Sequence, residues 1–567
     1  MRHRFLMLSF GALAGLAFYL LFEWLPDVVP HQASYLVLTT WALVFGIAAL
    51  ANAGPVSLAR SVIGAGALAT VMSLLMVSVY GRFGDLNAMF DTGHPIFAAI
   101  VIGFIALPFL SALAMARGSW RDYALLFNLA WGAVTRTIAA CAFTGVFWGL
   151  LFLSNALLKL VGLDVIQDFI DTDGVPWVLS GAIMGIALAL VFELEDYISP
   201  NLILRMLRLF LPMVLLVVLV FLVALPVRGL SNLFGHLSAA MILMGIAIVA
   251  IGLVSTALGQ TQTEGVQQRA MKGMTQALAV AGACVAALAV YAVAIRVGQY
   301  GWTPERLAAL TVACVTLAYG MVYTLAIAAR GDWASRIRQA NIRLALVVMA
   351  TIAVWMTPLL NPQKIATNSQ IARYQVGILP SELPLFEMQR DWGIVGRNGL
   401  EHLAELAQAA DDTAVLSAIE NAREAKTRYA FKQLQLKNEK PAIKAALSEF
   451  PQGSGGAEAL LQALPRWELD ILHRDCVLRD TANCVLITGV FQPGFTGLEL
   501  LLIVPQGPKS ARLTRYKIAD GVANSSRGNT VMLDPDTLTA LLEGEFRIAP
   551  SSANAIWVGD TEINPYN

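Results

Sequence analysis

The stretch LFLPMVLLVVLVFLVALP, residues 209–226, decides the fold class of this chain. None of its eighteen residues carries a charged, amide or hydroxyl side chain. A helix needs about 20 apolar residues to cross the roughly 30 Å hydrocarbon layer of a bilayer, and one charge at its centre costs about 2.5–3.5 kcal/mol. The stretch therefore predicts a membrane-spanning helix.

The same criterion applied outward from this stretch predicts eleven spans. The first follows Arg2 and Arg4 and continues into Glu23 without a small-residue cleavage site, so we expect a retained anchor and not a signal peptide. The predicted spans lie near residues 5–22, 34–53, 61–80, 95–116, 137–158, 175–193, 209–226, 236–259, 273–295, 307–329 and 343–361.

The composition agrees with a membrane protein and divides the chain in two. Only 14% of the 567 residues are charged and 57% are hydrophobic, whereas a soluble domain carries about 25% charged residues. Residues 1–360 hold 19 Lys+Arg and 15 Asp+Glu, and residues 361–567 hold 20 and 24. We expect a transmembrane helical domain over 1–361 and a soluble region after it. No strongly basic domain is present, so no nucleic-acid partner is expected.

The basic residues predict the orientation. With a cytoplasmic N-terminus, fourteen of the nineteen Lys and Arg in residues 1–360 fall on the cytoplasmic side. The loop 160–174 then lies outside, and it holds four Asp without Lys or Arg. This bias fits the positive-inside rule. An odd number of spans places the C-terminal region outside the cytoplasm.

A helical pattern of about forty residues, from Trp120 towards Lys159, is too long for one crossing. We expect an interfacial helix over 119–136 that leads into a span from Thr137. Its apolar side chains would face the bilayer and its arginines the headgroups, namely Trp120, Tyr123, Leu126 and Leu129 against Arg121 and Arg136.

The soluble region changes character along its length. Residues 362–450 have helix-like apolar spacing and predict a helical connector. The segment 451–456, PQGSGG, predicts a linker. Beyond it, residues 457–567 predict a small α+β domain, with strands at 484–490, 498–504, 511–518, 530–533 and 555–558. Asp534, Pro535 and Gly544 have the spacing of an N-cap, a first helical residue and a C-terminal stop.

Cysteines provide a further prediction about the soluble region. Cys476 and Cys484 bracket a turn-like stretch, and in an oxidising compartment a disulfide between them would contribute roughly 2.5 kcal/mol. Two unrelated thiols remain the alternative; a zinc site is not favoured, because it would need two more ligands and His473 alone does not supply both. The other cysteines lie in predicted spans as small hydrophobes, namely Cys141, Cys284 and Cys314.

A search for catalytic motifs yields no catalytic residue, metal site or cofactor site. The six His form no metal-binding pattern, and no phosphate-binding loop is present. Ser454 lies among glycines without the strand that precedes a nucleophile elbow, so a linker role is favoured. His473 with Asp470 and Asp475 could form an acid/base pair, but a solvated surface is the favoured interpretation.

Within the spans, prolines and glycines are the main candidates. Pro108, Pro212 and Pro358 interrupt apolar runs, and broken helices can mark transporter sites. Carriers also tend to bury an ionisable group near the midplane, and the sequence presents no clear case. Three glycine pairs have the spacing that allows close helix packing, namely Gly11/Gly15, Gly145/Gly149 and Gly181/Gly185.

The densest polar segment between spans is residues 296–306. Thr303, Pro304 and Glu305 predict the N-cap, first residue and first-turn carboxylate of the tenth span. Tyr300 and Trp302 suit a membrane interface. The run Tyr-Gly-x-Thr-Pro-Glu-Arg, which includes Gly301 and Arg306, is the motif of interest.

This run and the stretch from Asn361-Pro362 through Ser369, Tyr374 and Gly396 to Leu403 resemble the bacterial domain of unknown function 4153 family. The resemblance covers roughly residues 120–410. It implies a bacterial multi-pass membrane protein. Together with the orientation predicted from the basic residues, this leads us to expect an inner-membrane location with a periplasmic C-terminal region. It implies no activity, so it assigns no catalytic role to any residue.

The leading functional hypothesis is a non-enzymatic envelope protein whose periplasmic domain binds a protein partner or senses a ligand. The alternative is a carrier or lipid-handling transporter, since eleven spans exceed what anchoring one domain requires. An integral-membrane enzyme is the third hypothesis. The expected partners are the lipid bilayer and a periplasmic protein or ligand; the sequence indicates no particular oligomeric state.

Overall fold

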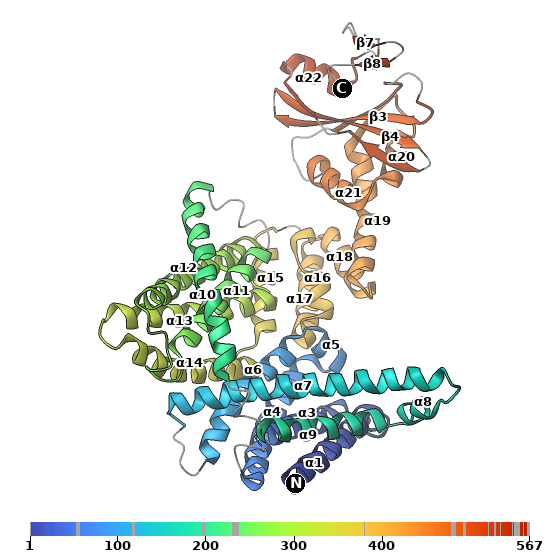
Figure 1. Ribbon diagram of the computed structural model, residues 1–567. Coiled ribbons are helices and arrows are strands. Elements are labelled where there is room, and N and C mark those ends of the chain that lie inside the picture. The colour runs from blue at the N-terminus through green and yellow to red at the C-terminus, as the bar shows by residue number, and fades with distance from the viewer. Residues whose placement is uncertain are drawn as a thin grey trace. The chain divides into compact units, whose positions relative to one another are not determined.

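The computed structural model divides the chain into two compact units, residues 1–416 and 417–567 (Figure 1). The first is helical, and the second combines helices with a sheet. The structure describes residues 2–52, 57–115, 120–193, 200–228, 237–378, 380–477, 484–491, 495–507, 509–519, 521–526, 529–532, 534–546, 548, 556–558 and 561–563.

Eleven helices among the described residues are long and apolar enough to cross a membrane, which confirms the predicted number. The first crossing joins α1 (Arg2–Tyr19), the π-helical turn η1 (Leu20–Trp24) and α2 (Leu25–Val28). Two short helices, α5 (Leu86–Asp91) and α8 (Val165–Ile170), lie between spans. The remaining ten membrane-spanning helices are α3 (Gln32–Asn52), α4 (Leu58–Phe83), α6 (His94–Ala114), α7 (Tyr123–Lys159), α9 (Val175–Glu193), α10 (Pro200–Arg228), α11 (Leu237–Leu258), α12 (Arg269–Tyr300), α13 (Pro304–Ala328) and α14 (Trp333–Met356).

Two of the three glycine pairs bring helix backbones together. Gly11 and Gly15 of α1 lie against α9, where a Cβ added at Gly11 would collide with the carbonyl oxygen of Gly181. A Cβ at Gly185 would likewise collide with the backbone of α1. Gly145 and Gly149 of α7 have no atom within 4 Å of such a Cβ among the described residues. Identical spacing therefore serves close packing at α1 and α9 but not at α7.

Helix α7 is one continuous helix of 37 residues. The side chain of Asp122 caps its N-terminus by accepting from the Ala124 amide at 2.9 Å. At 1.5 Å per residue the helix is about 55 Å long, so it exceeds the hydrocarbon layer. The structure has no break near Thr137, where the sequence suggested that an interfacial helix gives way to a span.

The prediction that the first turns of α7 face lipid and headgroups is wrong. Leu126 and Leu129 pack with Ala112 of α6 and Ile342 of α14, and Trp120 and Tyr123 join this cluster instead of facing lipid. Arg136 is 8% exposed and lies over the ring of Phe192, 5.8 Å from its centroid. An apolar stripe on a helix can be covered by other helices as well as by lipid, and its sequence pattern is the same in both cases.

If successive helices cross a membrane in opposite directions, the polar contacts between them join helix ends that lie on the same face. Arg4 near the start of α1 pairs with Glu193 at the end of α9, and Arg208 near the start of α10 donates to the Thr256 carbonyl near the end of α11 at 2.9 Å. We call this side the first face; it includes the loop 259–268.

At the other ends of the helices, Arg82 near the end of α4 donates to the carbonyl of Trp355 near the end of α14 at 2.7 Å. We call this side the second face. It includes the turn 301–303 and residues 357–361. These contacts agree with eleven consecutive crossings.

The helices that follow the last span form a small core of their own. They are α15 (Pro362–Gln375), the 3-10 turn η2 (Pro380–Glu382), α16 (Leu385–Arg390) and α17 (Gly393–Ala409). Trp392, Leu385, Met388 and Leu400 are almost fully buried there. Asn361 caps α15 by accepting from the Lys364 amide at 3.1 Å, with Pro362 at the first helical position. Helix α18 (Thr413–Glu424) follows α17 and contains the boundary between the two units.

The second unit is built on a six-stranded sheet. In space the order is β1 (Leu447–Phe450), β2 (Cys484–Thr488), β3 (Leu498–Gly507), β4 (Ser510–Ala519) and β5 (Val522–Ser525), and β6 (Asn529–Met532) also pairs with β4. Only the β1–β2 pair is parallel. Its helices are α19 (Arg428–Ala446), α20 (Gly456–Ala463), α21 (Arg466–Leu472), the π-helical turn η3 (His473–Val477) and α22 (Pro535–Glu543), and β7 (Ile556–Val558) pairs with β8 (Thr561–Ile563).

Both faces of the sheet are covered. Leu500 and Leu502 of β3 pack with the helices that precede β2, whereas Ile503 packs with Leu538 of α22 on the opposite face. This explains why β2 and β3 are nearly continuous apolar runs and do not alternate with polar residues. The predicted boundaries of α22 are confirmed: Asp534 accepts from the Thr537 amide at 3.0 Å, and Gly544 ends the helix with φ 84°.

The sheet begins earlier than the sequence suggested. Strand β1 lies within residues 362–450, which we expected to be helical, and it pairs with β2 beyond the segment 451–456. This segment therefore connects two parts of one folded unit. Leu447 is buried in the same cluster as α20 and β3, which accounts for its extended pairing.

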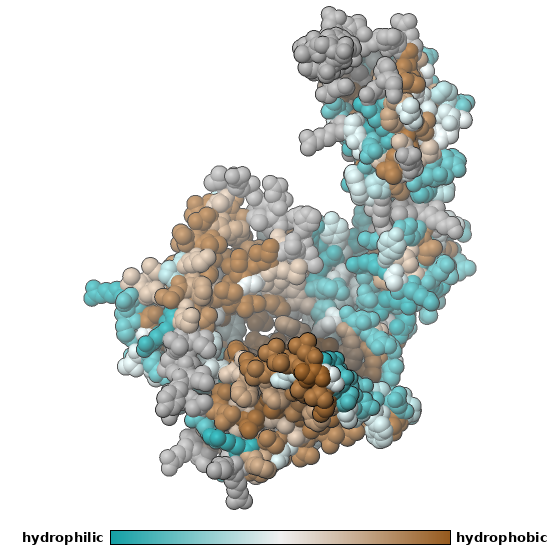
Figure 2. Space-filling model, turned by 45° about the vertical axis from the view of Figure 1, so that its right-hand side comes forward, coloured by the Kyte–Doolittle hydropathy of each residue, from teal (hydrophilic) through white to brown (hydrophobic). Residues whose placement is uncertain are grey.

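The surfaces of the two units differ as their compositions require. Figure 2 shows apolar side chains over much of the visible surface of the helical unit, whereas polar side chains predominate on the C-terminal unit. Exposed residues of the spans include Leu209, Met213, Leu216 and Val223 of α10, all more than 60% exposed. Such a surface fits contact with lipid and not with water.

Candidate functional site

The motif 300–306 forms the turn between α12 and α13 on the second face. Tyr300 is the last residue of α12 and Gly301 its C-cap. The Thr303 side chain accepts from the Arg306 amide at 3.3 Å and caps α13, with Pro304 at the first helical position. The predicted start of the tenth span is therefore confirmed.

Gly301 occupies a position that other residues would not tolerate. Its φ of 69° with ψ of −179° is a conformation in which side chains are strongly disfavoured. A Cβ there would also collide with Arg373 and Gln370 of α15. The glycine therefore allows α15 to approach the backbone of the turn.

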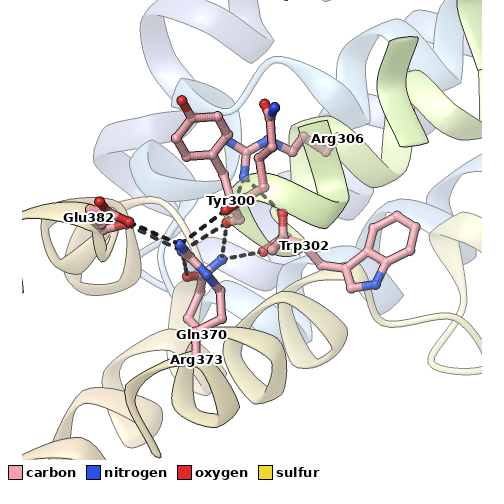
Figure 3. A network of polar contacts seen from close by, with 8 residues as sticks. Tyr300, Trp302, Arg306, Gln370, Arg373 and Glu382 are labelled. Carbon is pink, nitrogen blue, oxygen red and sulfur yellow. Dashed lines mark hydrogen bonds and ion pairs between the residues drawn. The ribbon is translucent and has the colours of Figure 1, made fainter. Parts of the chain in front are cut away.

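Three side chains donate to one backbone carbonyl in this turn. The carbonyl oxygen of Tyr300 accepts from Arg306 Nη1 at 3.1 Å, Gln370 Nε2 at 3.1 Å and Arg373 Nη1 at 3.0 Å (Figure 3). The C-terminal carbonyls of a helix lack intrahelical partners and carry partial negative charge. The donors therefore satisfy groups that α12 leaves open.

Further bonds attach α15 to the same turn. Gln370 Nε2 also donates to the Trp302 carbonyl at 2.8 Å, and the Trp302 amide donates to Ser369 Oγ at 3.0 Å. Gln370 is only 1% exposed. Together with Arg373, these side chains hold the α12–α13 turn against the first helix after the spans. We call this arrangement the clamp; it comprises Tyr300, Gly301, Trp302, Thr303, Arg306, Ser369, Gln370 and Arg373.

Charged side chains at the edge of the clamp add an ion pair and cation–π contacts. Glu382 of η2 lies 3.5 Å from Arg373, as Figure 3 shows. The guanidinium groups of Arg296 and Arg306 each lie 5.4 Å from the centroid of the Tyr300 ring. Cation–π contacts of this kind contribute about 0.5–1 kcal/mol at exposed sites.

The four motif residues singled out from sequence, Tyr300, Gly301, Thr303 and Arg306, are thus brought together. Sequence reasoning did not identify Gln370 and Arg373 as their partners. Ser369, Gln370 and Arg373 follow one another at intervals of one and three residues on α15, so they share a face of the helix. A polar face beside the strong Asn361-Pro362 helix start could have suggested them.

Two of the three prolines singled out in the predicted spans, Pro108 and Pro212, do not break their helices. α6 continues through Pro108 and α10 through Pro212 and Pro226. Proline is tolerated in membrane helices because neighbouring groups satisfy the carbonyl that it frees. Pro358 follows α14 and lies after the helix has ended. The structure therefore provides no interrupted helix at Pro108 or Pro212.

A second polar cluster, which sequence patterns did not predict, lies towards the first face. Tyr323 of α13 donates to Asn341 Oδ1 of α14 at 2.6 Å and lies 3.1 Å from Ser255 Oγ of α11. Nearby, Arg338 donates to the carbonyl of Leu258 at 2.7 Å. Ser255, Tyr323 and Asn341 come from three different helices and are distant in sequence, so no local pattern connects them.

The C-terminal unit contains the predicted disulfide between Cys476 and Cys484. Cys484 begins β2, and both cysteines are buried in the core beneath the helices. The residues 478–483 between them lie outside the described part of the chain. No group of three or more His, Cys, Asp or Glu that could hold a metal ion occurs within the described residues.

Asp475 and Ser454, which were considered as catalytic candidates, form ion pairs or hydrogen bonds with other residues of the C-terminal unit. Asp475, expected on a solvated surface, is instead buried and forms ion pairs with Arg512 and Arg474. Desolvation raises the pKa of Asp475, but the bonds from both arginines outweigh it and lower that pKa overall. Ser454 donates to Glu449 Oε1 at 2.6 Å, and this carboxylate also accepts from the Ala457 amide at the start of α20.

The clamp lies within the part of the chain that matches a known protein family. The model of a family described as Domain of unknown function (DUF4153) matches residues 32–381, more than half of the chain. The chain belongs to this family. The DUF4153 match covers ten of the eleven spans and every clamp residue, and it ends within η2. Comparison with curated proteins and with solved structures gives no match.

Proposed function

We propose that this DUF4153 protein is a non-enzymatic protein of the bacterial inner membrane whose C-terminal unit lies in the periplasm and binds a protein or ligand there. The clamp carries this proposal. Its polar side chains bind backbone groups of the same chain, so their role is to fix α15 to the last spans. Any force or displacement on the chain after α15 would thereby reach the α12–α13 hairpin.

Two observations support the periplasmic side. Eleven crossings place the N-terminus and the chain after Met356 on opposite faces, and the basic residues favour the first face. The disulfide of the C-terminal unit suits an oxidising compartment.

The carrier hypothesis draws less support from the geometry. A carrier of the broken-helix type binds its substrate where spans are interrupted near the midplane, and α6 and α10 are continuous at their prolines. The two polar pockets described for this chain border residues 257–272 at the first face and do not lie midway along the spans.

Reporter fusions test the orientation. Alkaline phosphatase and green fluorescent protein fused after Arg338 and after Lys364 should give opposite activities, because one span separates the two points. Phosphatase activity only after Lys364 is expected. The same compartment at both points would overturn the topology on which the proposal rests.

Photo-crosslinking tests partner binding in intact cells. Trp467 and Val522 are large apolar residues of the C-terminal unit that are 60% and 58% exposed. A benzophenone amino acid at each position should give a discrete adduct. The variant Arg373→Gln should lower the adduct yield severalfold at equal protein level, whereas Lys364→Gln, an exposed charge on the same helix, should leave it unchanged. The proposal fails if neither position gives an adduct or if both variants behave alike.

A further inference from the structure

A pocket of about 600 Å³ opens at the first face, between the start of α10 and the loop before α12. Arg205 and Arg208 line one side, and Thr263 to Gln268 line the other. A volume of 300–1,000 Å³ is typical of sites for small molecules. We call this the basic pocket.

The wall of the basic pocket is held by hydrogen bonds. Arg208 donates through Nε to the Thr256 carbonyl at 2.9 Å and through Nη1 to the Glu264 carbonyl at 2.8 Å. Gln260 donates to the Glu264 carboxylate, so the acidic side chain among the described lining residues is already engaged. The loop is therefore fixed across from the arginines without help from a ligand.

The charge of the pocket favours an anion. Arg205 is exposed and, within the described residues, forms no hydrogen bond or ion pair that would neutralise it. Gln268, the N-cap of α12, makes no side-chain capping bond, so the first amides of this 32-residue helix are left for another acceptor. Two guanidinium groups and a helix N-terminus thus surround one cavity.

An apolar surface continues directly from the pocket. The span of α10 begins at Leu204, so Arg205 and Arg208 lie at the level where lipid headgroups meet the hydrocarbon layer. Further along α10, Met206, Leu209 and Phe210 are 59%, 76% and 54% exposed. A molecule with an anionic head and apolar tails would satisfy the pocket and this surface together.

We propose that the basic pocket binds the phosphate of an anionic phospholipid, with the acyl chains along α10. Basic pockets between membrane helices recognise such headgroups by charge and hydrogen bonding, and Arg205 supplies a planar fork of donors to phosphate oxygens. This site lies on the face opposite the clamp and is independent of what the C-terminal unit binds.

Lipid titration of the full chain in a neutral maltoside detergent tests the proposal. Native mass spectrometry should show saturable binding of dioleoyl phosphatidylglycerol that is at least about fivefold tighter than binding of dioleoyl phosphatidylcholine. Arg205→Gln should remove this preference, and Arg205→Lys should restore part of it. Arg60→Gln, which removes an exposed charge from the same face outside the pocket, should keep the preference.

Three results would overturn the inference. The two lipids could bind equally well, Arg60→Gln could reduce the preference as much as Arg205→Gln does, or inorganic phosphate could bind as tightly as the lipid, which would point to a free anion. Unchanged thermal midpoints of Arg205→Gln and Arg205→Lys in the absence of lipid exclude misfolding as the cause of lost binding.

Discussion

The helical unit and the C-terminal unit provide different partners for their buried and half-buried arginines. In the helical unit, Arg338 donates to the carbonyls of Leu258, Gly259 and Thr261, where α11 ends. In the C-terminal unit, Arg512 instead pairs with the carboxylate of Asp475. The helical unit, residues 1–416, contains 22 Asp and Glu, and the C-terminal unit, residues 417–567, contains 17, so acidic residues are about twice as frequent per residue in the C-terminal unit.

This comparison shows how the helical unit accommodates arginine side chains without a carboxylate partner for each of them. The last carbonyls of a helix lack intrahelical donors and lie at the negative end of its dipole, so they accept from arginine as a carboxylate would. Arg82, Arg208 and Arg373 repeat the arrangement at other helix ends. Both units have apolar cores; the helical unit adds close backbone approach and arginine–carbonyl bonds, and the C-terminal unit adds a buried carboxylate paired with arginine and a disulfide.

The largest effect is expected where helix backbones approach most closely. Gly181→Leu places a side chain against the Gly11 carbonyl, which α1 and α9 can relieve only by separating. We expect a loss of about 4 kcal/mol of stability, seen as loss of monodisperse protein in fluorescence-detected size-exclusion chromatography.

Gly145→Leu is the matched control, since the space around Gly145 is open within the described residues. It should leave the elution profile unchanged. Equal damage from both substitutions would show that the close contact of α1 and α9 is not what stabilises the helical unit.

A smaller loss is expected from removing an arginine–carbonyl anchor. Arg338→Gln shortens the side chain and leaves three carbonyls after α11 without their charged donor, a loss of about 3 kcal/mol. Thermal unfolding in detergent should show a lower midpoint. Arg343→Gln, an exposed arginine of the same helix, should change the midpoint little, and a similar drop in both variants would contradict the anchoring role.

Removing the disulfide should affect only the sheet unit. The double variant Cys476→Ser and Cys484→Ser opens a short loop, with an expected loss of roughly 2.5 kcal/mol. Hydrogen exchange measured by mass spectrometry should show faster exchange in β2 and β3 and no change in α11 to α14. Faster exchange in the spans would mean that the two units do not unfold independently.

The smallest effect concerns pH and the Asp475 ion pair. Because desolvation is outweighed by the bonds from Arg512 and Arg474, which lower the pKa of Asp475 in the folded protein, the contribution of this carboxylate to stability is present above the unfolded value near 3.9 and is lost as pH falls through the folded value. Exchange in η3 and β4 should accelerate below about pH 4. Asp475→Asn should remove this acid-dependent step, and a variant that keeps it would rule out Asp475 as its source.

Local features of the fold were predictable. Eleven spans, the caps at Thr303 and Asp534, and the stop at Gly544 follow from short stretches in which each residue responds to lipid, water or its own backbone. Part of the candidate site was predictable from sequence, since Gly301 and Thr303 are residue types typical of a turn and a helix N-cap. Gln370 was not, because it lies about seventy residues away and its neighbours in sequence are those of any helix.

The sequence by itself determined that the chain crosses a membrane and how often it does so, but it left Cys476 and Cys484 as either a disulfide or two unrelated thiols, and the structure joins them. Only the tertiary structure decided which glycine pairs touch, that Leu126 faces helices and not lipid, and which carbonyls Arg338 and Arg373 reach. The physical reason is range: hydrophobicity and capping act within a few residues, whereas a contact between helices depends on how segments far apart in the chain approach one another in space.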